Sequence, residues 1–233
     1  NSLMLALRNR DFLRVWAVGI CGGTMRWLEV LAVSVYTLSL TGSALAVALM
    51  FFARTGPTLL CAPIAGTLAE RLPRRVLLGV GSGLMFFTSL TLATLAYSGA
   101  LVLWQVASGA VISGIVWSLE HTVRRTIVRD VVDARIIGHA ISLDSSSQNA
   151  TRMAGPLLGG ALFAAVGMPG AYAIGAVVYG VAVAVIFTIK APLPATSESR
   201  ESLVRSIASV LAYVRTNRTV ASVLMITICP NFF

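Results

Sequence analysis

The chain has 233 residues, of which 57% are hydrophobic (the AVILMFWYC set) and only 12% are charged, whereas globular domains carry about 45–50% and about 25%. These proportions exclude a soluble domain, a disulfide-stapled secreted scaffold and a disordered acidic tail. A net charge of +9 would suit nucleic-acid binding, but the cations lie between long apolar runs. The composition therefore predicts an integral protein of the lipid bilayer that does not bind nucleic acid.

Apolar runs of the length that a membrane-spanning helix needs, about 20 residues, follow one another along the chain. They cover Phe12–Leu38, Ser43–Leu68, Val76–Tyr97, Leu101–Leu119, Ala140–Val166 and Gly170–Ile189, and another begins near Thr219 and reaches Phe233. The sequence predicts a six-helix bundle over residues 1–190, a cytoplasmic loop over 191–218 and the start of a seventh helix over 219–233. Within the loop, an apolar stripe from Leu203 to Val214 predicts either a short helix on the membrane surface or a solvated linker helix.

The segments between the runs alternate in charge. The turns Ser39–Gly42, Ser98–Ala100 and Gly167–Gly170 carry none. All but three cations lie in the other segments: Arg8, Arg10, Arg14, Arg71, Arg74, Arg75, Arg124, Arg125, Arg129, Arg135, Lys190, Arg200, Arg205, Arg215 and Arg218. Because Lys and Arg mark cytoplasmic loops, we expect the N-terminus in the cytoplasm.

The three remaining cations, Arg26, Arg54 and Arg152, fall inside apolar runs, each about 18 Å from the cytoplasmic boundary at ~1.5 Å per helical residue. Glu29 is placed to pair with Arg26 at i,i+3, and Asp144 lies two turns before Arg152 on the same run. A charge at this depth costs about 2.5–3.5 kcal/mol. Three arginines against Glu29 leave excess positive charge, which predicts a central cavity for a small anionic molecule; the alternative is ion pairs that only lock helices.

Two further patterns concern packing. Glycines recur four residues apart in three runs, a spacing that allows close helix contact in lipid: Gly19/Gly23, Gly79/Gly83 and Gly155/Gly159. Arg54 and Arg152 each stand shortly before a Gly-Pro, in the second and fifth runs, which cross the membrane in opposite directions. This similarity between the second and fifth runs predicts inverted repeats of three helices with a binding site at the midplane. No metal-ligand spacing occurs, so we expect neither a metal nor another cofactor.

The loop after the second run reads GTLAERLPRR from Gly66 to Arg75. It resembles the signature of the major facilitator superfamily between helices 2 and 3, with Glu70 in place of Asp and Pro73 in place of Gly. The resemblance implies that the motif stabilises one transport conformation through charge pairs on the cytoplasmic side. The residues concerned are Gly66, Leu68, Glu70, Arg71, Arg74 and Arg75.

A second stretch is similar to the helix-5 motif of antiporters in this superfamily, through Gly155, Pro156, Gly159 and Gly160. Residues 40–47 and 213–218 resemble a bacterial branch that holds the enterobactin exporter and macrolide-efflux-type proteins. One departure is Gln105, which stands four residues before Gly109 where members of the superfamily often have arginine. A proton role for that arginine does not carry over.

The resemblance implies an all-α integral membrane protein, the N-terminal six-helix half of a twelve-helix fold, covalently continuous with a second half. It also implies export of a small molecule, anionic or siderophore-like, across the bacterial cytoplasmic membrane by alternating access with proton antiport. Glu29 is the candidate proton carrier, and no enzymatic activity is expected. The alternatives are a multidrug or macrolide exporter of the same fold, the permease subunit of an ATP-driven transporter, and a membrane scaffold without transport.

Overall fold

The computed structural model of the chain describes residues 9–132 and 136–189, and all regular structure in this part is helical. The helices are α2 (Arg10–Thr41), α3 (Ala44–Arg71), α4 (Arg74–Tyr97), α5 (Leu103–Val131) and α6 (Ile137–Phe187). α6 departs from helical geometry at Gly167 and so comprises two helices joined by a bend. The expected loop at 191–218 and the seventh helix at 219–233 lie outside the described residues.

The three uncharged turns each contain a glycine in the left-handed region, where other residues are strained. Gly42, Gly99 and Gly167 have φ values of 62°, 71° and 63°. At the first turn the Gly42 N–H donates to the carbonyl of Leu38 at 2.8 Å, which ends α2 with a left-handed cap. Ser43 then caps α3 by accepting a hydrogen bond from the Ala46 N–H. The sequence therefore places all three turns correctly.

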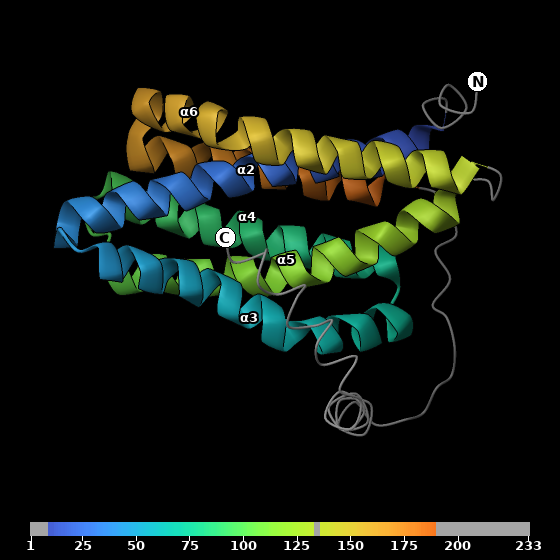
Figure 1. Ribbon diagram of the computed structural model, residues 1–233, viewed down its shortest axis with the longest axis horizontal. Coiled ribbons are helices and arrows are strands. Elements are labelled where there is room, and N and C mark those ends of the chain that lie inside the picture. The colour runs from blue at the N-terminus through green and yellow to red at the C-terminus, as the bar shows by residue number, and fades with distance from the viewer. Residues whose placement is uncertain (1–8, 133–135, 190–233) are drawn as a thin grey trace.

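Successive helices run in opposite directions, so that the α2–α3 turn and the bend in α6 lie at the same end of the bundle (Figure 1). The main packing pairs are α2 with α6, α4 with α6, and α3 with α5. α2 contacts the first half of α6 through Gly155 and Gly159, and α4 contacts the second half through Gly175 and Gly180. With α6 counted as two helices, α2, α3 and α4 correspond in order to α5 and the first and second halves of α6. Under this correspondence the α2–α6 pair maps onto the α3–α5 pair, and the α4–α6 pair maps onto itself, as inverted repeats require.

One boundary differs from the expectation. The apolar run predicts an end at Leu119, but α5 continues to Val131. Arg124, Arg125 and Arg129 therefore belong to a helix rather than a loop, and Arg124 is buried. A charge interrupts an apolar run without breaking backbone hydrogen bonds, so hydropathy alone ends the element too early.

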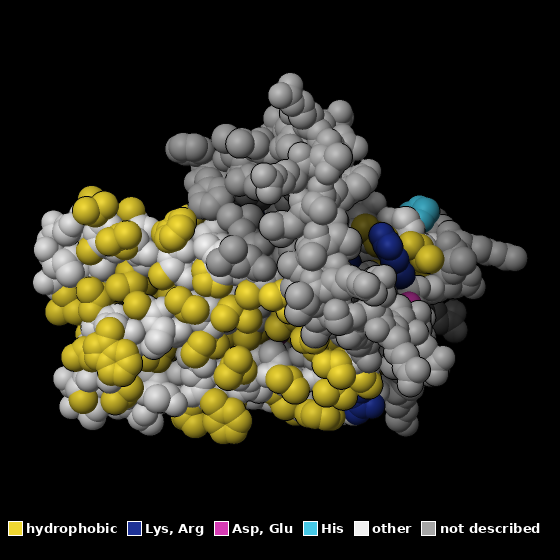
Figure 2. Space-filling view, turned by 90° about the horizontal axis from the view of Figure 1, so that it is seen from below, with side chains coloured by type: hydrophobic (Ala, Val, Ile, Leu, Met, Phe, Trp, Pro, Cys, Tyr) yellow, Lys and Arg dark blue, Asp and Glu magenta, His cyan; other side chains and the backbone are white. Residues whose placement is uncertain are grey.

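The outer surface is strongly apolar. Trp104, Phe87 and Leu157 are exposed by 70%, 65% and 78% of their surface, and Figure 2 shows hydrophobic side chains over much of one face, with the cations near the right-hand end. Among the described residues, α2, α4, α5 and α6 are long and apolar enough to cross a membrane. An exterior of this kind is soluble in lipid rather than in water, and the chain is an all-α integral membrane protein.

The interior contains two apolar clusters. One includes Phe12, Ile127 and Ile186, and the other includes Leu28 and Met85. The polar side chains described below lie between these clusters and within the second one. These clusters pack the helices that carry the buried charges.

Small residues bring helix backbones close together at specific points. At Gly114 a Cβ atom would collide with the carbonyl oxygen of Arg54, and at Gly159 it would lie 3.1 Å from the backbone of Leu28. The prediction of close contact holds for Gly155 and Gly159, whereas a Cβ atom at Gly83 would meet nothing within 4 Å. The closest approach of α3 and α5, at Gly114, does not follow from the four-residue spacing.

Replacing Gly114 with Ala should destabilise the bundle, because the added methyl group meets backbone rather than a mobile side chain. We expect a loss of about 1–3 kcal/mol, the usual cost of overpacking, measured as a lower melting temperature of the purified full-length protein. The matched control is Gly83→Ala, which should melt at the same or a higher temperature. Equal melting temperatures for the two variants would contradict the close packing of α3 on α5.

Candidate functional site

A buried ion pair lies inside the bundle. Arg54 on α3 places Nη2 3.5 Å from Oε2 of Glu29 on α2. The Tyr179 hydroxyl of α6 donates to Glu29 Oε1 at 3.1 Å, and the Ser113 hydroxyl of α5 donates to Oε2 at 3.3 Å. Four helices therefore converge on one carboxylate. Because burying a charge without partners is costly, these contacts explain how Glu29 and Arg54 reside in an apolar core.

A small cavity borders this pair. Glu29, Arg54 and Ser113 line it together with Ser89 and Tyr172. Hydroxyl, carboxylate and guanidinium groups thus meet an apolar wall, the mixture typical of small-molecule sites. The sequence predicts a central cavity beside the midplane charges, and this small cavity is the candidate for it.

Arg26 is not paired with Glu29, contrary to the i,i+3 expectation. Its guanidinium carbon instead lies 3.9 Å from the ring centroid of Trp117 on α5, a cation–π contact. Spacing along a helix allows the Arg26–Glu29 pair, but Arg54 reaches Glu29 from a neighbouring helix. Arg26 is nevertheless close enough to Arg54 and Arg152 for their charges to interact.

Arg152 is exposed on α6 and does not join the buried pair. Its neighbours Met153 and Leu157 are also exposed, by 84% and 78%. Neither Arg26 nor Arg152 forms an ion pair with a carboxylate in the described part of the chain. Arg26 therefore lies within electrostatic range of the buried Arg54 without a carboxylate partner of its own, whereas Arg152 lies on an exposed part of α6.

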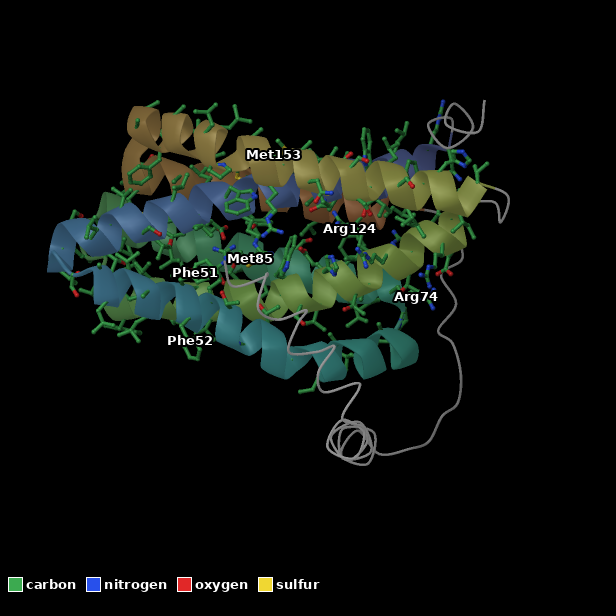
Figure 3. All side chains as sticks on the ribbon, viewed as in Figure 1. Phe51, Phe52, Arg74, Met85, Arg124 and Met153 are labelled. Atoms are coloured by element: carbon green, nitrogen blue, oxygen red, sulfur yellow. The ribbon has the colours of Figure 1, made fainter. Side chains whose placement is uncertain are left out.

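Asp144 belongs to a second polar cluster rather than to the site around Glu29. Asp144 Oδ2 lies 3.5 Å from Nη2 of Arg124. With its amide oriented so that the oxygen faces Arg124, Gln148 accepts hydrogen bonds from both Nη atoms at 2.7 and 3.1 Å. The guanidinium occupies the space that a side chain at Gly19 would need. In Figure 3 Arg124 lies inside the bundle, farther from its end than Arg74.

Most partners of the buried charges do not follow from the sequence patterns described above. Ser113, Trp117, Glu120 and Arg124 recur on α5 at i, i+4, i+7 and i+11, which places them on one helix face. Each contacts or faces a charged group of the bundle. In the sequence these residues form a polar stripe at helical spacing. The stripe crosses Leu119, where the apolar run ends, so hydropathy does not assign its two parts to one helix.

The Gly66–Arg75 motif lies at the opposite end from the uncharged turns. Arg74, at the start of α4, forms an ion pair with Asp130 near the end of α5, and Arg75 lies 5.7 Å from the Phe187 ring centroid. Gly66 and Leu68 are partly buried on α3. The side chains of Glu70 and Arg71 lie outside what the structure describes.

The helix-5 motif has a packing role in this structure. Gly155 leaves room for Trp27, and Gly159 and Gly160 face Leu28 and Leu31 of α2. Pro156 lies on the exposed side of α6, within the helix. Within the described ranges, no group of His, Cys, Asp and Glu is placed to hold a metal ion.

The helical multi-pass architecture, its repeat-like packing and the basic motif between α3 and α4 agree with the major facilitator superfamily. The chain belongs to the transmembrane secretion effector family, which matches residues 2–232. It is also 26% identical over 158 residues to the staphyloferrin A transporter of Staphylococcus aureus (strain NCTC 8325 / PS 47), covering 67% of this chain and 40% of that protein.

A second relative is an uncharacterized MFS-type transporter, YfiS, of Bacillus subtilis (strain 168). It is 26% identical over 164 residues, covering 69% of this chain and 38% of that protein. The chain thus spans about two fifths of the length of the relatives that it matches. Both relatives are named as transporters.

The Arg54–Glu29 pair supplies a stability prediction. Arg54→Gln should cost about 3–5 kcal/mol, because it leaves Glu29 as an uncompensated buried charge. Adding Glu29→Gln should recover most of the loss, and Arg152→Gln, at an exposed position, should have little effect. The measurement is thermal unfolding of the purified full-length variants. Losses that simply add in the double variant would show that the two side chains do not interact.

Proposed function

We propose that this chain forms the N-terminal half of a secondary active transporter that exports a small anionic, siderophore-like molecule. The bundle would rock against a second half around the site at Glu29 and Arg54, as alternating access requires. Family membership supports the transporter class. The observation that carries the anionic substrate is the set of buried or central arginines, of which Glu29 neutralises only Arg54.

The arginines suit an anion for a geometric reason as well. A guanidinium group presents a planar fork that matches carboxylate or catecholate oxygens. Arg26 holds its fork over Trp117, and both groups offer a flat surface to a conjugated or carboxylate-bearing ligand. A cationic drug would meet net positive charge in the same place, which argues against the multidrug alternative.

Proton coupling is assigned to Glu29. Its carboxylate orients the Arg54 fork through the ion pair and holds the hydroxyls of Tyr179 and Ser113. Protonation would weaken all three contacts and disorder the anion site. Substrate and proton would then exclude each other, which is the requirement for antiport and inward proton flow during export.

The same ion pair supports a second candidate, anion–proton symport. Protonation of Glu29 also frees the Arg54 fork to bind an anion, in which case substrate and proton would bind together. The two candidates differ in whether Glu29 serves mainly to orient Arg54 or to occupy it. In antiport, binding of a proton weakens binding of the substrate, whereas in symport it strengthens it, and this difference separates the two candidates.

The transport test uses the full-length protein in inside-out proteoliposomes with labelled staphyloferrin A as the probe. Antiport predicts that an acidic lumen drives accumulation of the probe, because protons leave as the anion enters. Arg26→Gln should weaken probe binding about 10- to 100-fold, the value of a charge-assisted bond of about 1.5–3 kcal/mol. Arg26→Lys should recover part of this, since a point charge lacks the fork. Accumulation driven by an alkaline lumen would instead establish symport.

We propose that the ion pairs and hydrogen bonds at the basic end, which carries the Gly66–Arg75 motif, stabilise one conformation of the transporter. The pair of Arg74 with Asp130 ties α4 to α5, and Asn9 Nδ2 donates to the carbonyl of Val131 at 2.7 Å, which ties the start of α2 to the same end. Together with Glu70 and Arg71 of the motif, these groups would hold the half together as a rigid unit while the two halves separate. Exposed parts of such a network contribute little to stability, so their effect falls on the balance of conformations.

Orientation in the bacterial cytoplasmic membrane is part of the proposal, with the basic end in the cytoplasm. A cysteine placed at Ser98, in the turn after α4, should react in intact cells with a thiol reagent that does not cross the membrane. A cysteine at His139, at the start of α6, should react only after the cells are opened. Both are made in a background with Cys21, Cys61 and Cys229 replaced. The reverse labelling pattern would invert the topology.

A further inference from the structure

The polar face of α5 extends well beyond the site at Glu29. Ser113 donates to Glu29 and Trp117 holds Arg26, while one and two turns farther along Glu120 and Arg124 lie on the same face. The distance from Ser113 to Arg124 along the helix is about 16 Å at ~1.5 Å per residue. The stripe therefore leads from the buried ion pair toward the basic end of the bundle.

Glu120 is partly buried and differs in its partners from the buried carboxylates Glu29 and Asp144. Glu29 holds Arg54 and Asp144 holds Arg124, whereas Glu120 forms no ion pair with any cation in the described ranges. Its one hydrogen bond there comes from the Ser82 hydroxyl of α4 to Oε1 at 3.1 Å. A proton can be added to Glu120 or removed from it without breaking an ion pair.

The charged and titratable groups facing Glu120 come from three helices. Arg124 faces it from α5, Glu29 from α2 and Tyr179 from α6, each near enough for the charges to interact. The Tyr179 hydroxyl also donates to Glu29. Tyr179 therefore contacts Glu29 directly and lies within electrostatic range of Glu120.

Glu120 also faces a cavity that is distinct from the one beside Arg54. Its walls include Glu120, His121 and Arg124, together with Gly19 of α2 and Ile189 after α6. Ile189 and the start of α2 belong to the basic end, which Figure 1 places opposite the uncharged turns. Glu120 therefore lies within electrostatic range of Glu29 and lines a cavity whose walls reach Ile189 near the basic end.

We propose that Glu120 is a second proton-carrying carboxylate, which passes protons between Glu29 and the cavity at the basic end. The inference rests on the proposed coupling at Glu29. In the transfer, the O–H bond of protonated Glu29 breaks and an O–H bond forms on the Glu120 carboxylate. One proton has then moved from Glu29 to Glu120, from which it leaves through the cavity.

The first test separates proton-driven transport from exchange of the probe across the membrane, which needs no net proton movement. For Glu120→Gln in full-length protein, we expect gradient-driven accumulation of staphyloferrin A to fall at least about 100-fold, the low end for loss of a positioned proton-transfer group. Exchange of labelled for unlabelled probe should stay within twofold of the wild type. Glu120→Asp should keep part of the driven transport. Ser82→Ala, which removes the hydrogen bond and retains the carboxylate, is the matched control and should keep most of it.

The outcomes of this test are decisive in both directions. Normal driven transport by Glu120→Gln would overturn the proposal, and so would a loss of exchange equal to the loss of driven transport, which is what a purely structural role predicts. If the wild type itself shows no response to a pH gradient, the coupling in the proposed function fails instead.

A second measurement needs no substrate. Infrared difference spectra of the purified full-length protein across a pH titration should contain carboxyl bands from groups that gain and lose protons inside the bundle. Glu120→Gln should remove one such band and Glu120→Asp should shift it, while Ser82→Ala should move the same band through the lost hydrogen bond. A spectrum unchanged by both Glu120 substitutions would show that Glu120 does not titrate, even where the transport of the wild type is proton-coupled.

Discussion

A charged side chain inside a lipid bilayer must find its partner within the protein, and this constraint governs the arrangement of the whole bundle. Arg54 finds Glu29, and Arg124 finds Asp144, each at 3.5 Å and each across two different helices. The neighbouring hydroxyls and the Gln148 amide satisfy further polar atoms of the same groups. Because removing any one member leaves a buried charge unpaired, the pairs specify which helix faces meet, while the apolar contacts supply most of the cohesion.

The backbone geometry follows from that requirement. Guanidinium groups are large, and the helices make room for them with small residues. Gly19 provides the space that Arg124 fills, and Gly114 allows α5 to approach the backbone at Arg54. The charged pairs and the small residues therefore act together: the glycines permit close contact, and the charges select which contacts form. A bundle held by apolar packing alone would tolerate rotation of its helices, since lipid and leucine side chains are equally apolar.

The sequence was sufficient to predict the membrane class, the apolar helices and the turns, because length and hydropathy determine these directly. Gly42, Gly99 and Gly167 mark the turns with the backbone angles that only glycine adopts freely. Position along the helix axis was also predictable, since each residue advances a helix by a fixed rise. Rotation was not. The pairing of Arg26 with Glu29 was wrong, and Asp144 joined Arg124, because partners on other helices depend on which faces meet, and this is decided by packing across the chain. The α5 stripe was missed for a related reason, since a charge ended the apolar run while the helix continued.

The hydrogen bond between Tyr179 and Glu29 joins residues 150 positions apart in the chain, which has a consequence for biogenesis. Glu29 enters the membrane long before the ribosome has made Tyr179, so during synthesis it depends on a partner that is available earlier. Arg54 is that partner, because it lies on the next helix, and α2 and α3 can insert together as a hairpin with the Glu29–Arg54 pair already formed. The later helices then complete a site whose electrostatic core was assembled first. The order in which the chain is synthesised is thus also the order in which its buried charges are secured.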